Sequence, residues 1–588
     1  MIQYPKLTAQ ETSRQTIDTF KGYNHNLRIS DGEFYDMKNL TSDHYPVLSP
    51  RGNRGVYASP NNPQGLIAKD SLCYVDGSNF VINQRSIEMG LSTREEDCPK
   101  QLISMGAYVI IMPDKKWINT LPQKDNEYQH GNIEASFTTN ADVNFSLCNI
   151  NGEAFSNETI PTDEPKNPEN MDLWIDTSSK PHTLKQYSTA SAMWVSIATT
   201  YIMIYSPGIG AAFEKYDGVT ISGITIDALQ DLNSTMVVWD RGDDYIVVVG
   251  ILDVSATQEL SQGAVTVERK MPTMDFVIES ENRLWGCHYG VAANGEVVNE
   301  IYACKLGDFK NWNCFMGLST DSYAASCGTD GQFTGAITHL GYPLFFKENF
   351  VHKVYGNYPA NFQIQTTACR GVQKGCYKSL AIVNETLFYK ARSGVCGYDG
   401  SLPTEVSYVM GNEAYSEAVG GSHGNKYYIS MKDTSEEYHL FVFDTAKGMW
   451  HKEDNLQVDC FCSCRGEMYA ISGGEIITLL GSGTQDTESV EWMAETGEIG
   501  ITSPDMKYIS RLTIRMSMCI GSEVRIYAQY DFDDEWDQLC VLKGYNLRSF
   551  SIPIRPKRCD YMKLRIEGEG TAKIYSITKT IEQGSELS

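Results

Sequence analysis

Three cysteines in the segment CFCSC come nearest, by type and spacing, to a reactive or metal-binding site. Cys460, Cys462 and Cys464 alternate along the chain, so on a β-strand their thiols share one face. A structural zinc centre needs four converging ligands, and here the remaining ligands would have to come from distant segments. The 16 cysteines of the chain include no Cys-x-x-Cys pair. The pattern therefore favours buried, reduced thiols, with a metal site or disulfides as the alternatives.

Two acidic stretches offer carboxylates to a cation. Asp533, Asp534 and Glu535 are consecutive, and residues 242–244 read Gly-Asp-Asp. A calcium site needs six to eight converging oxygen ligands. Because both stretches have the composition of hairpin turns, we interpret them as solvated tips, with calcium binding as the alternative for residues 533–535.

The chain lacks several local motifs of reaction chemistry. Neither His-Glu-x-x-His nor Gly-x-x-x-x-Gly-Lys-Ser/Thr occurs, and these are the patterns of zinc proteases and phosphate-binding loops. The ten histidines are scattered, with no two at ligand spacing. The paired acids that a glycosidase places across its pocket are not recognisable. We therefore expect no catalytic residues, no cofactor and no metal, and we predict that the chain is not an enzyme.

Three aromatic residues in a proline-rich region are candidates for ligand contact. Trp174, Tyr187 and Trp194 lie within a stretch of small and polar residues. Such rings either pack a very small core or stack on the faces of sugars. They are a candidate site for a glycan or a partner, with a small core as the alternative.

The elements that must hold these residues are mostly short strands. The chain has 588 residues, of which 41% are hydrophobic and 21% charged, as in folded proteins. Aromatic residues make up 11%, including 34 Tyr, and there are 49 Gly. Tyrosine favours strands and glycine favours turns. We therefore expect an all-β fold.

A unit of a short strand, a tight polar turn and a second strand recurs along the chain. In the first unit, Asp76 and Gly77 make the turn between two alternating strands. Seven such units predict a β-propeller of about six or seven blades, with an array of β-sandwiches as the alternative. Gly420 and Gly421 are interpreted as points of close backbone approach. The units are residues 71–83, 106–120, 281–312, 341–356, 384–400, 425–452 and 466–481.

The pattern changes twice along the chain. Prolines and then aromatics replace the hairpin units between residues 121 and 270, which predicts an insertion of one or two small β modules. The segment YISRLTIRMSM alternates apolar and polar residues, as in a sandwich with one solvated face. The predicted divisions are an N-terminal arm (1–55), the first part of the propeller (56–120), the inserted β modules (121–270), the remainder of the propeller (271–485) and a C-terminal β-sandwich (486–588).

The net charge of −25 argues against binding to a phosphate backbone. It suits a solvated surface or an acidic passage through which DNA slides without sticking. Residues 193–213 lack charge, but polar residues, proline and glycine interrupt them, so we expect strands rather than a membrane span. The first 20 residues contain no apolar core of a secretory signal.

Three stretches resemble virion proteins of tailed bacteriophages. These are NLTSDHYPVLSPRGNRG (39–55), MDLWIDTSSKPHTLKQYSTASAMWVSI (171–197) and the C-terminal segment that begins AETGEIGITSPDMKYIS (494–510). The first and third are similar to packaged-DNA stabilisation or nozzle proteins. That resemblance implies a propeller at the head–tail junction or exit channel. The second is similar to a module of tail and tail-fibre proteins. The insertion that contains it is where this sequence departs from the nozzle proteins.

The stretch 39–55 is also a candidate docking arm. Its prolines hold an extended path and its arginines offer charge-assisted donors. We expect this arm to wrap the first blade of the propeller, closing the ring or contacting a neighbouring subunit, with an ordinary packed loop as the alternative. The residues assigned to the arm are Tyr45, Pro46, Pro50, Arg51 and Arg54.

The expected function is that of a structural component of a bacteriophage neck or tail, part of a nozzle or tail-hub ring through which DNA exits. The expected location is the virion, after synthesis in the host cytoplasm. The expected partners are further copies in a homo-oligomeric ring, other neck and tail proteins, and DNA in non-specific passage, with no membrane. The alternative is a tail-tip protein that binds a host surface glycan through the insertion.

Overall fold

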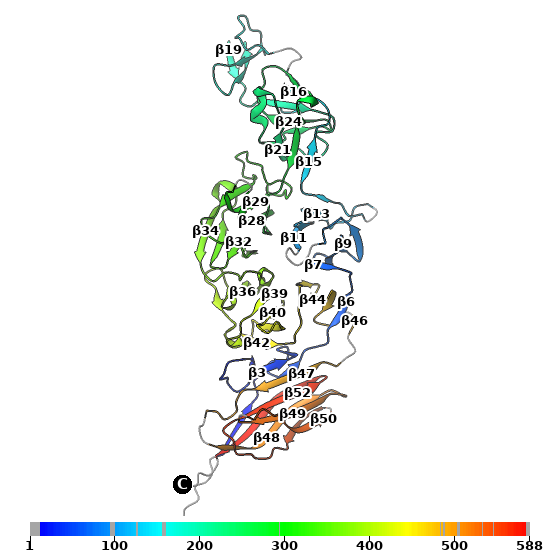
Figure 1. Cartoon of the computed structure of the whole chain (residues 1–588), viewed down its shortest axis with the longest axis vertical. Coiled ribbons are helices and arrows are strands. Elements are labelled where there is room, and N and C mark those ends of the chain that lie inside the picture. Colours follow the sequence, from blue (N-terminus) through cyan, green and yellow to red (C-terminus); the bar gives the residue numbers. More distant parts are fainter. Residues whose placement is uncertain are drawn as a thin grey trace, which may run out of the picture.

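A computed structural model shows that the chain is almost entirely β-structure (Figure 1). The helices in the described part are short 3-10 turns: η2 (Asp227–Leu232), η3 (Leu260–Gln262), η4 (Pro359–Asn361), η5 (Tyr377–Ser379) and η6 (Tyr408–Met410). The structure describes residues 12–583 except 94–99, 125–126, 156–159, 293–294, 482–483, 486–488, 503–505, 532 and 545. Within these residues, no helix has the length and apolar character needed to cross a lipid bilayer.

Six four-stranded antiparallel sheets follow one another along the chain, each with its strands in sequential order. The first three are β7 (Pro63–Ala68), β8 (Leu72–Asp76), β9 (Asn79–Ile82), β10 (Arg85–Glu88); β11 (Gln101–Met105), β12 (Tyr108–Met112), β13 (Lys116–Asn119), β14 (His130–Asn132); and β27 (Phe276–Ser280), β28 (Arg283–Val291), β29 (Val297–Ala303), β30 (Tyr323–Ser326). The next three are β31 (Gly335–His339), β32 (Tyr342–Lys347), β33 (Phe350–Tyr355), β34 (Gln363–Ala368); β35 (Ala381–Val383), β36 (Thr386–Ala391), β37 (Gly394–Tyr398), β38 (Thr404–Glu405); and β39 (Ser416–His423), β40 (Lys426–Lys432), β41 (Tyr438–Asp444), β42 (Met449–Lys452).

The seventh sheet joins the two ends of this region. Its strands are β43 (Cys460–Cys464), β44 (Glu467–Ser472), β45 (Glu475–Thr478), β6 (Gly55–Ala58) and β46 (Thr484–Gln485). Strand β6 precedes the first sheet in the sequence but pairs antiparallel with β45. This pairing covers the edge of the last sheet, which would otherwise be open to other strands.

The first strands of the seven sheets form a ring. Strand β7 contacts β11, β11 contacts β27, and β27 contacts β31. The turn η5, just before β35, contacts β31; β35 then contacts β39, β39 contacts β43, and β43 contacts β7. Figure 1 shows the seven sheets arranged about a common centre. Each of the seven hairpin units expected from the sequence lies in a different one of these sheets.

The sheets are held together by apolar side chains from facing surfaces. Val75 and Phe80 of the first sheet share a fully buried cluster with Val109, Ile111 and Ile118 of the second. The alternation of side chains along each strand places one set on each face. Each sheet of the ring therefore buries one face against each of its two neighbours. This explains the long runs of apolar residues in the second strand of each sheet.

Gly420 of β39 lies at a close approach to the backbone of the turn η5, as expected from the sequence. A Cβ atom at this position would lie 2.6 Å from the backbone oxygen of Ser379 and 2.8 Å from the hydroxyl of Tyr427. We predict that Gly420→Ala lowers the free energy of unfolding by about 1–3 kcal/mol, because overpacking forces the backbones apart. The measurement is urea denaturation. Gly52→Ala, whose Cβ would meet no atom within 4 Å, is the control and should change stability by less than about 0.5 kcal/mol. Equal stability of the two variants would contradict the close approach.

The insertion forms two packed sheets and a third, smaller sheet. Phe145 and Ile204 of the five-stranded sheet share a buried core with Val219 and Val267 of the four-stranded one. Figure 1 shows the insertion projecting from the ring at one end of the molecule, with β19 at the tip. The sheets are β15 (Ala135–Thr138), β26 (Thr266–Arg269), β21 (Gly218–Ser222), β22 (Thr235–Val237); β23 (Asp240–Arg241), β24 (Tyr245–Val249), β20 (Tyr201–Tyr205), β16 (Val143–Cys148), β25 (Ala256–Gln258); and β17 (Leu173–Asp176), β18 (Thr183–Ser188), β19 (Met193–Ser196).

Two more sheets lie at the opposite end of the molecule (Figure 1) and combine both ends of the chain. Leu512 of one sheet and Ile526 and Leu564 of the other belong to one buried core. Strand β48 alternates buried and more exposed residues over most of its length, as the sequence predicts. The sheets are β1 (Thr12–Ile17), β53 (Ala572–Gln583), β48 (Lys507–Met518), β51 (Asn546–Ile552); and β2 (Gly22–Tyr23), β3 (Glu33–Lys38), β47 (Glu491–Thr496), β52 (Met562–Glu569), β49 (Glu523–Tyr530), β50 (Asp537–Lys543). A small pair, β4 (Leu40–Thr41) and β5 (Ser49–Pro50), follows β3.

Candidate functional site

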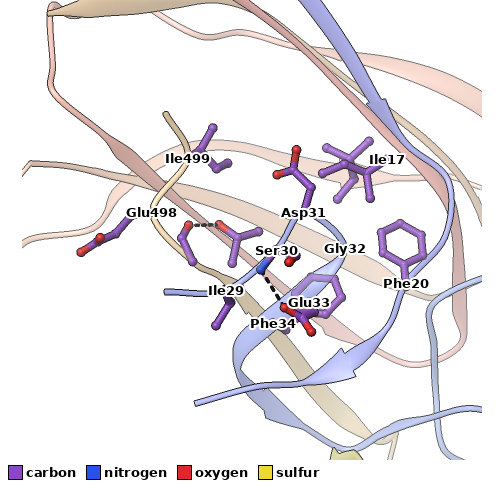
Figure 2. Close-up of a pocket in the computed structure, with 13 residues that line it drawn as sticks. Ile17, Phe20, Ile29, Ser30, Asp31, Gly32, Glu33, Phe34, Glu498 and Ile499 are labelled. Atoms are coloured by element: carbon purple, nitrogen blue, oxygen red, sulfur yellow. Dashed lines mark hydrogen bonds between the residues drawn. The ribbon is translucent and has the colours of Figure 1, made fainter. Parts of the chain in front are cut away.

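A small cavity lies between the N-terminal segment and the C-terminal sheets (Figure 2). Its volume is about 30 Å³, above the roughly 10–15 Å³ that a cavity needs to hold one water molecule. The backbone N–H of Ser30 donates to Oε2 of Glu33 at 2.7 Å, and the hydroxyl of Thr496 donates to the carbonyl oxygen of Gly497 at 2.9 Å. Several of the polar groups on its wall are thus already paired. The cavity suits ordered water.

Two carboxylates lie on the described first strands of the seven sheets, Glu279 and Glu417. The Tyr438 hydroxyl donates to Glu417 at 2.5 Å and the Lys432 ammonium at 3.3 Å. These groups hold the pKa of the Glu417 carboxyl below its ordinary value, so it is ionised at neutral pH. Most of the carboxylates behind the net charge of −25 therefore lie outside these first strands.

The sequence contains one nucleophile-type pattern that the sequence analysis missed. Residues 420–424 read Gly-Gly-Ser-His-Gly, which fits Gly-x-Ser-x-Gly. In hydrolases that use this pattern, the serine occupies a sharp turn from a strand into a helix. Here Ser422 lies within β39, and the chain turns directly into β40. The strand-to-helix geometry of that motif is therefore not formed by these residues.

Among the residues that the structure describes, one group of three side chains could converge on a cation. Ligand atoms of Asp433, Glu437 and His439 lie within 4.8 Å of one another at the turn between β40 and β41. Nε2 of His439 is 2.8 Å from Oδ2 of Asp433, and Oδ1 of Asp433 accepts the backbone N–H groups of Ser435 and Glu437. The carboxylate is thus satisfied within the turn. The sequence analysis missed this group because only the hairpin brings the imidazole over the aspartate.

The three cysteines of CFCSC lie on one face of β43, as their spacing predicts. Cys464 is buried, and Cys460 and Cys462 pack against the same cluster, which includes Leu66 of the first sheet. Phe461 packs in the cluster on the opposite face. Burial raises the pKa of all three thiols, so they are protonated at neutral pH and are poor nucleophiles.

The predicted docking arm binds within its own chain. Arg54 donates to Asp454 at 2.5 Å and to Glu453 at 2.8 Å, and Arg51 donates to Asp454 at 3.3 Å. Burial opposes the charge of the Arg54 guanidinium, but these carboxylates outweigh burial and raise its pKa. Arg51 also donates to the side chain of Asn39 at 2.9 Å. The arginines thus attach the arm to the end of the sixth sheet.

The prediction that the arm wraps the first blade is therefore corrected. The arm lies against the sixth sheet and the C-terminal sheets, because its ionic partners follow β42 and Leu48 exchanges backbone hydrogen bonds with Ile574. The strand that closes the ring is β6, directly after Arg54. Pro50 pairs with Leu40 in the small β4–β5 pair. Tyr45 is 43% exposed, and the carbonyl oxygen of Pro46 accepts the backbone N–H of Phe20 at 3.2 Å.

The three candidate aromatic residues come together on the three-stranded sheet at the tip of the insertion. The ring centroids of Trp174 and Trp194 are 5.4 Å apart, and those of Tyr187 and Trp194 are 5.3 Å apart. The ammonium of Lys185 lies 4.8 Å from the Trp174 centroid and 2.6 Å from Oδ2 of Asp176. All three rings are partly exposed. We call these three rings the aromatic face.

The opposite side of this sheet is its core side. Ile175 and Leu184 are fully buried and pack with Leu147 and Ile160. Because side chains alternate along strands, Trp174 and Lys185 must lie on the other side. The aromatic face therefore points away from the core of the module.

Buried histidines predict that the protein loses stability in acid. His352 is buried between the hydroxyls of Thr329 and Thr366, each 2.9 Å from a ring nitrogen. Burial, and then Lys347, lower its pKa from 6.5 to about 4. The unfolded chain therefore binds more protons as the pH falls from about 6.5 to about 4, and each such histidine removes about 1.4 kcal/mol of stability per pH unit in that window.

The measurement for this prediction is the urea midpoint between pH 7 and pH 4. His352→Asn should reduce the slope with pH. His130→Ala, at an exposed histidine, is the control and should leave the slope unchanged. A slope that is the same in all three proteins would contradict the assignment to His352.

Comparisons with known proteins give no family. No protein-family model and no curated protein matches this chain. Among solved structures, an acylaminoacyl peptidase of Pyrococcus horikoshii matches with 8% identity and a TM-score of 0.23, over 53% of this chain and 55% of the peptidase. An exo-β-1,3-galactanase from Phanerochaete chrysosporium, solved with galactose, matches with 7% identity and a TM-score of 0.20, over 52% of this chain and 94% of the enzyme. An engineered GH43 glycoside hydrolase matches with 8% identity and a TM-score of 0.20, over 53% and 96%.

These neighbours contradict the expectation that the chain is not an enzyme, and that expectation is withdrawn. The three proteins are a peptidase and two glycoside hydrolases. The expectation depended on the absence of short motifs, but active sites are assembled from residues far apart in the sequence and need leave no such motif. The chain spans only about half the length of the peptidase, and the likeness assigns no activity to it.

Proposed function

We propose that this chain is a structural component of a tailed-bacteriophage virion. In this proposal the seven sheets form a seven-bladed β-propeller, the C-terminal sheets form a β-sandwich, and the insertion is a projecting β module. The location is the neck or tail, in a nozzle or tail-hub ring through which DNA exits. The chain functions there with further copies of itself and with other neck and tail proteins.

The observation that carries the proposal is the placement of two accessory parts at opposite ends of the ring (Figure 1). The C-terminal sheets incorporate the N-terminal strands β1, β2 and β3, so that end is a firmly assembled unit suited to lasting contacts. The insertion is joined to the ring by its two chain connections and by a hydrogen bond from Asn311 of the ring to Asp217 of the insertion. A rigid disc with separate attachment surfaces suits a connecting role in an assembly, and the sequence resemblance of three stretches to phage virion proteins supports the class of assembly.

A second candidate function is receptor binding by the insertion. The aromatic face favours it, because partly exposed tryptophans on an outward surface are typical of ligand contacts. In this case the chain would occupy the tip of the tail. Replacing residues 161–197 by a short Gly-Ser linker separates the two candidates. Particles that assemble but no longer adsorb favour receptor binding, and particles that lose DNA or tails favour the neck.

The experiment that tests the main proposal is quantitative mass spectrometry of purified particles from a phage that encodes this chain. The expected result is a fixed number of copies per particle, greater than one, that persists through density-gradient purification and washing with concentrated salt. A chain that is abundant in the infected cell but absent from purified particles would overturn the proposal.

A further inference from the structure

We infer that the aromatic face binds uncharged hexopyranose units of a polysaccharide. The inference deepens the second candidate function, on which it rests, because it names the ligand class of that site.

The outward surface combines aromatic rings with hydrogen-bonding groups in a single layer. In the register of the sheet, Trp174 lies opposite Lys185, and Lys185 lies opposite Ser196 on the next strand. Tyr187 lies opposite Trp194. Asp176 lies opposite Thr183, so a carboxylate and a hydroxyl follow the rings along the same side.

This composition matches the two surfaces of a hexopyranose ring. One face of such a sugar presents C–H groups, and its rim presents hydroxyls. An aromatic ring offers an apolar plane to the C–H groups. Neighbouring carboxylate, ammonium and hydroxyl groups can accept and donate hydrogen bonds at the rim. A purely apolar partner would leave the ion pair of Lys185 and Asp176 dehydrated, which costs free energy.

The charge of the module argues against anionic ligands. Residues 161–197 contain five carboxylates and three lysines, a net charge of −2. Lys185, the lysine next to the rings, is already bonded to Asp176 at 2.6 Å. That bond, ahead of those from Ser178, holds the pKa of the Asp176 carboxyl well below its ordinary value. A nucleic acid, an acidic polysaccharide or an anionic lipid surface would therefore meet net repulsion, and Lys185, the described lysine beside the rings, is already paired.

The rings are positioned independently of the core of the module. Trp194 packs edge-on against both Trp174 and Tyr187, and the indole N–H of Trp174 donates to the carbonyl oxygen of Thr162 at 3.0 Å. The buried residues Ile175 and Leu184 lie on the other side of the sheet. Truncation of Trp194 therefore removes part of the aromatic face and leaves the core of the module intact.

The test is affinity electrophoresis of the full chain in native gels that contain one soluble polysaccharide each. The neutral probes are a glucan, a galactan and a mannan, and the anionic probe is heparin. We expect wild-type protein to be retarded by at least one neutral polysaccharide and not by heparin. Trp194→Ala should weaken that binding at least about tenfold, the equivalent of about 1.4 kcal/mol, and Trp194→Phe should retain most of it.

Trp239→Ala is the matched control. Trp239 is also partly exposed, lies in the same insertion, and packs edge-on against Tyr201 and Tyr216 at 5.7 and 6.1 Å. It should leave retardation unchanged. Near-ultraviolet circular dichroism and the melting temperature of each variant report whether the fold is retained.

Three results would overturn the inference: no retardation of the wild type in any neutral gel, retardation by heparin alone, or equal losses in Trp194→Ala and Trp239→Ala. Because the test uses free protein, these results would leave the virion proposal standing. Absence of the chain from particles would, conversely, leave sugar binding measurable.

Discussion

Asp217→Asn is expected to lower the free energy of unfolding by about 3–5 kcal/mol, because it leaves a buried guanidinium without its counter-charge. Asp217 forms an ion pair with Arg269, and their side chains are only 3% and 6% exposed. Nδ2 of Asn311 donates to Asp217 at 2.9 Å, and the backbone N–H of Gly218 donates back to Asn311 at 2.8 Å. This network joins the insertion to the loop between β29 and β30, so its loss should loosen the insertion from the ring.

Urea denaturation and limited proteolysis measure this effect. The variant should unfold at a lower urea concentration and should be cleaved more rapidly near the base of the insertion. Asp240→Asn is the matched control, because Asp240 pairs with Lys215 at 3.5 Å on a more exposed surface, where an ion pair contributes about 0–1 kcal/mol. If the two variants have the same midpoint, the buried network does not fasten the insertion.

Arg54→Ala should have the next largest effect, a loss of about 2–3 kcal/mol of the free energy of unfolding, in the range that hydrogen bonds to charged groups contribute. It removes one of the two arginines that pair with Glu453 and Asp454, whose side chains are 10% and 20% exposed, and leaves Arg51 beside them. Strand β6 begins at Gly55, the next residue, and pairs with β45. Loss of the ion pairs should therefore weaken both the arm and the closure of the ring.

Hydrogen exchange of the amides in β45 and β6 measures ring closure directly. Exchange should accelerate in Arg54→Ala. In the control Lys38→Ala it should not, because the pair of Lys38 with Glu491 is 48% and 76% exposed. Unchanged protection of β45 in Arg54→Ala would show that the arm does not support the closure.

The repeated hairpins were predictable because their signals are local. An Asp-Gly turn such as Asp76-Gly77 lies between strands that alternate apolar and polar residues, and Gly77 adopts a φ of +58°. Such a turn fixes its own register over a few residues. The same reasoning predicted that Cys460, Cys462 and Cys464 share one face of a strand, and the structure confirms it.

Long-range pairings were not predictable from the same signals. Thr478 hydrogen-bonds to Gly55, which is 423 residues away in the sequence, and Arg54 is 400 residues from Asp454. The short segment Gly55–Ala58 carries no local signal that identifies β45 as its partner strand. For the same reason the arm that precedes it was assigned to the wrong sheet. The aromatic face was predictable in part. Trp174 and Trp194 are near in sequence, so their proximity could be expected, but only the register of the sheet shows that they share the side away from the core.

The central claim is that the ring and its two end modules are part of an assembled phage particle. The most direct measurement is a cryo-electron-microscopy map of the intact particle from a phage that encodes this chain. The account predicts several copies around the neck or tail axis, each with a disc-shaped ring, its C-terminal sheets against other virion proteins and its insertion projecting. A map at side-chain resolution whose neck and tail densities are all explained by other chains would contradict it.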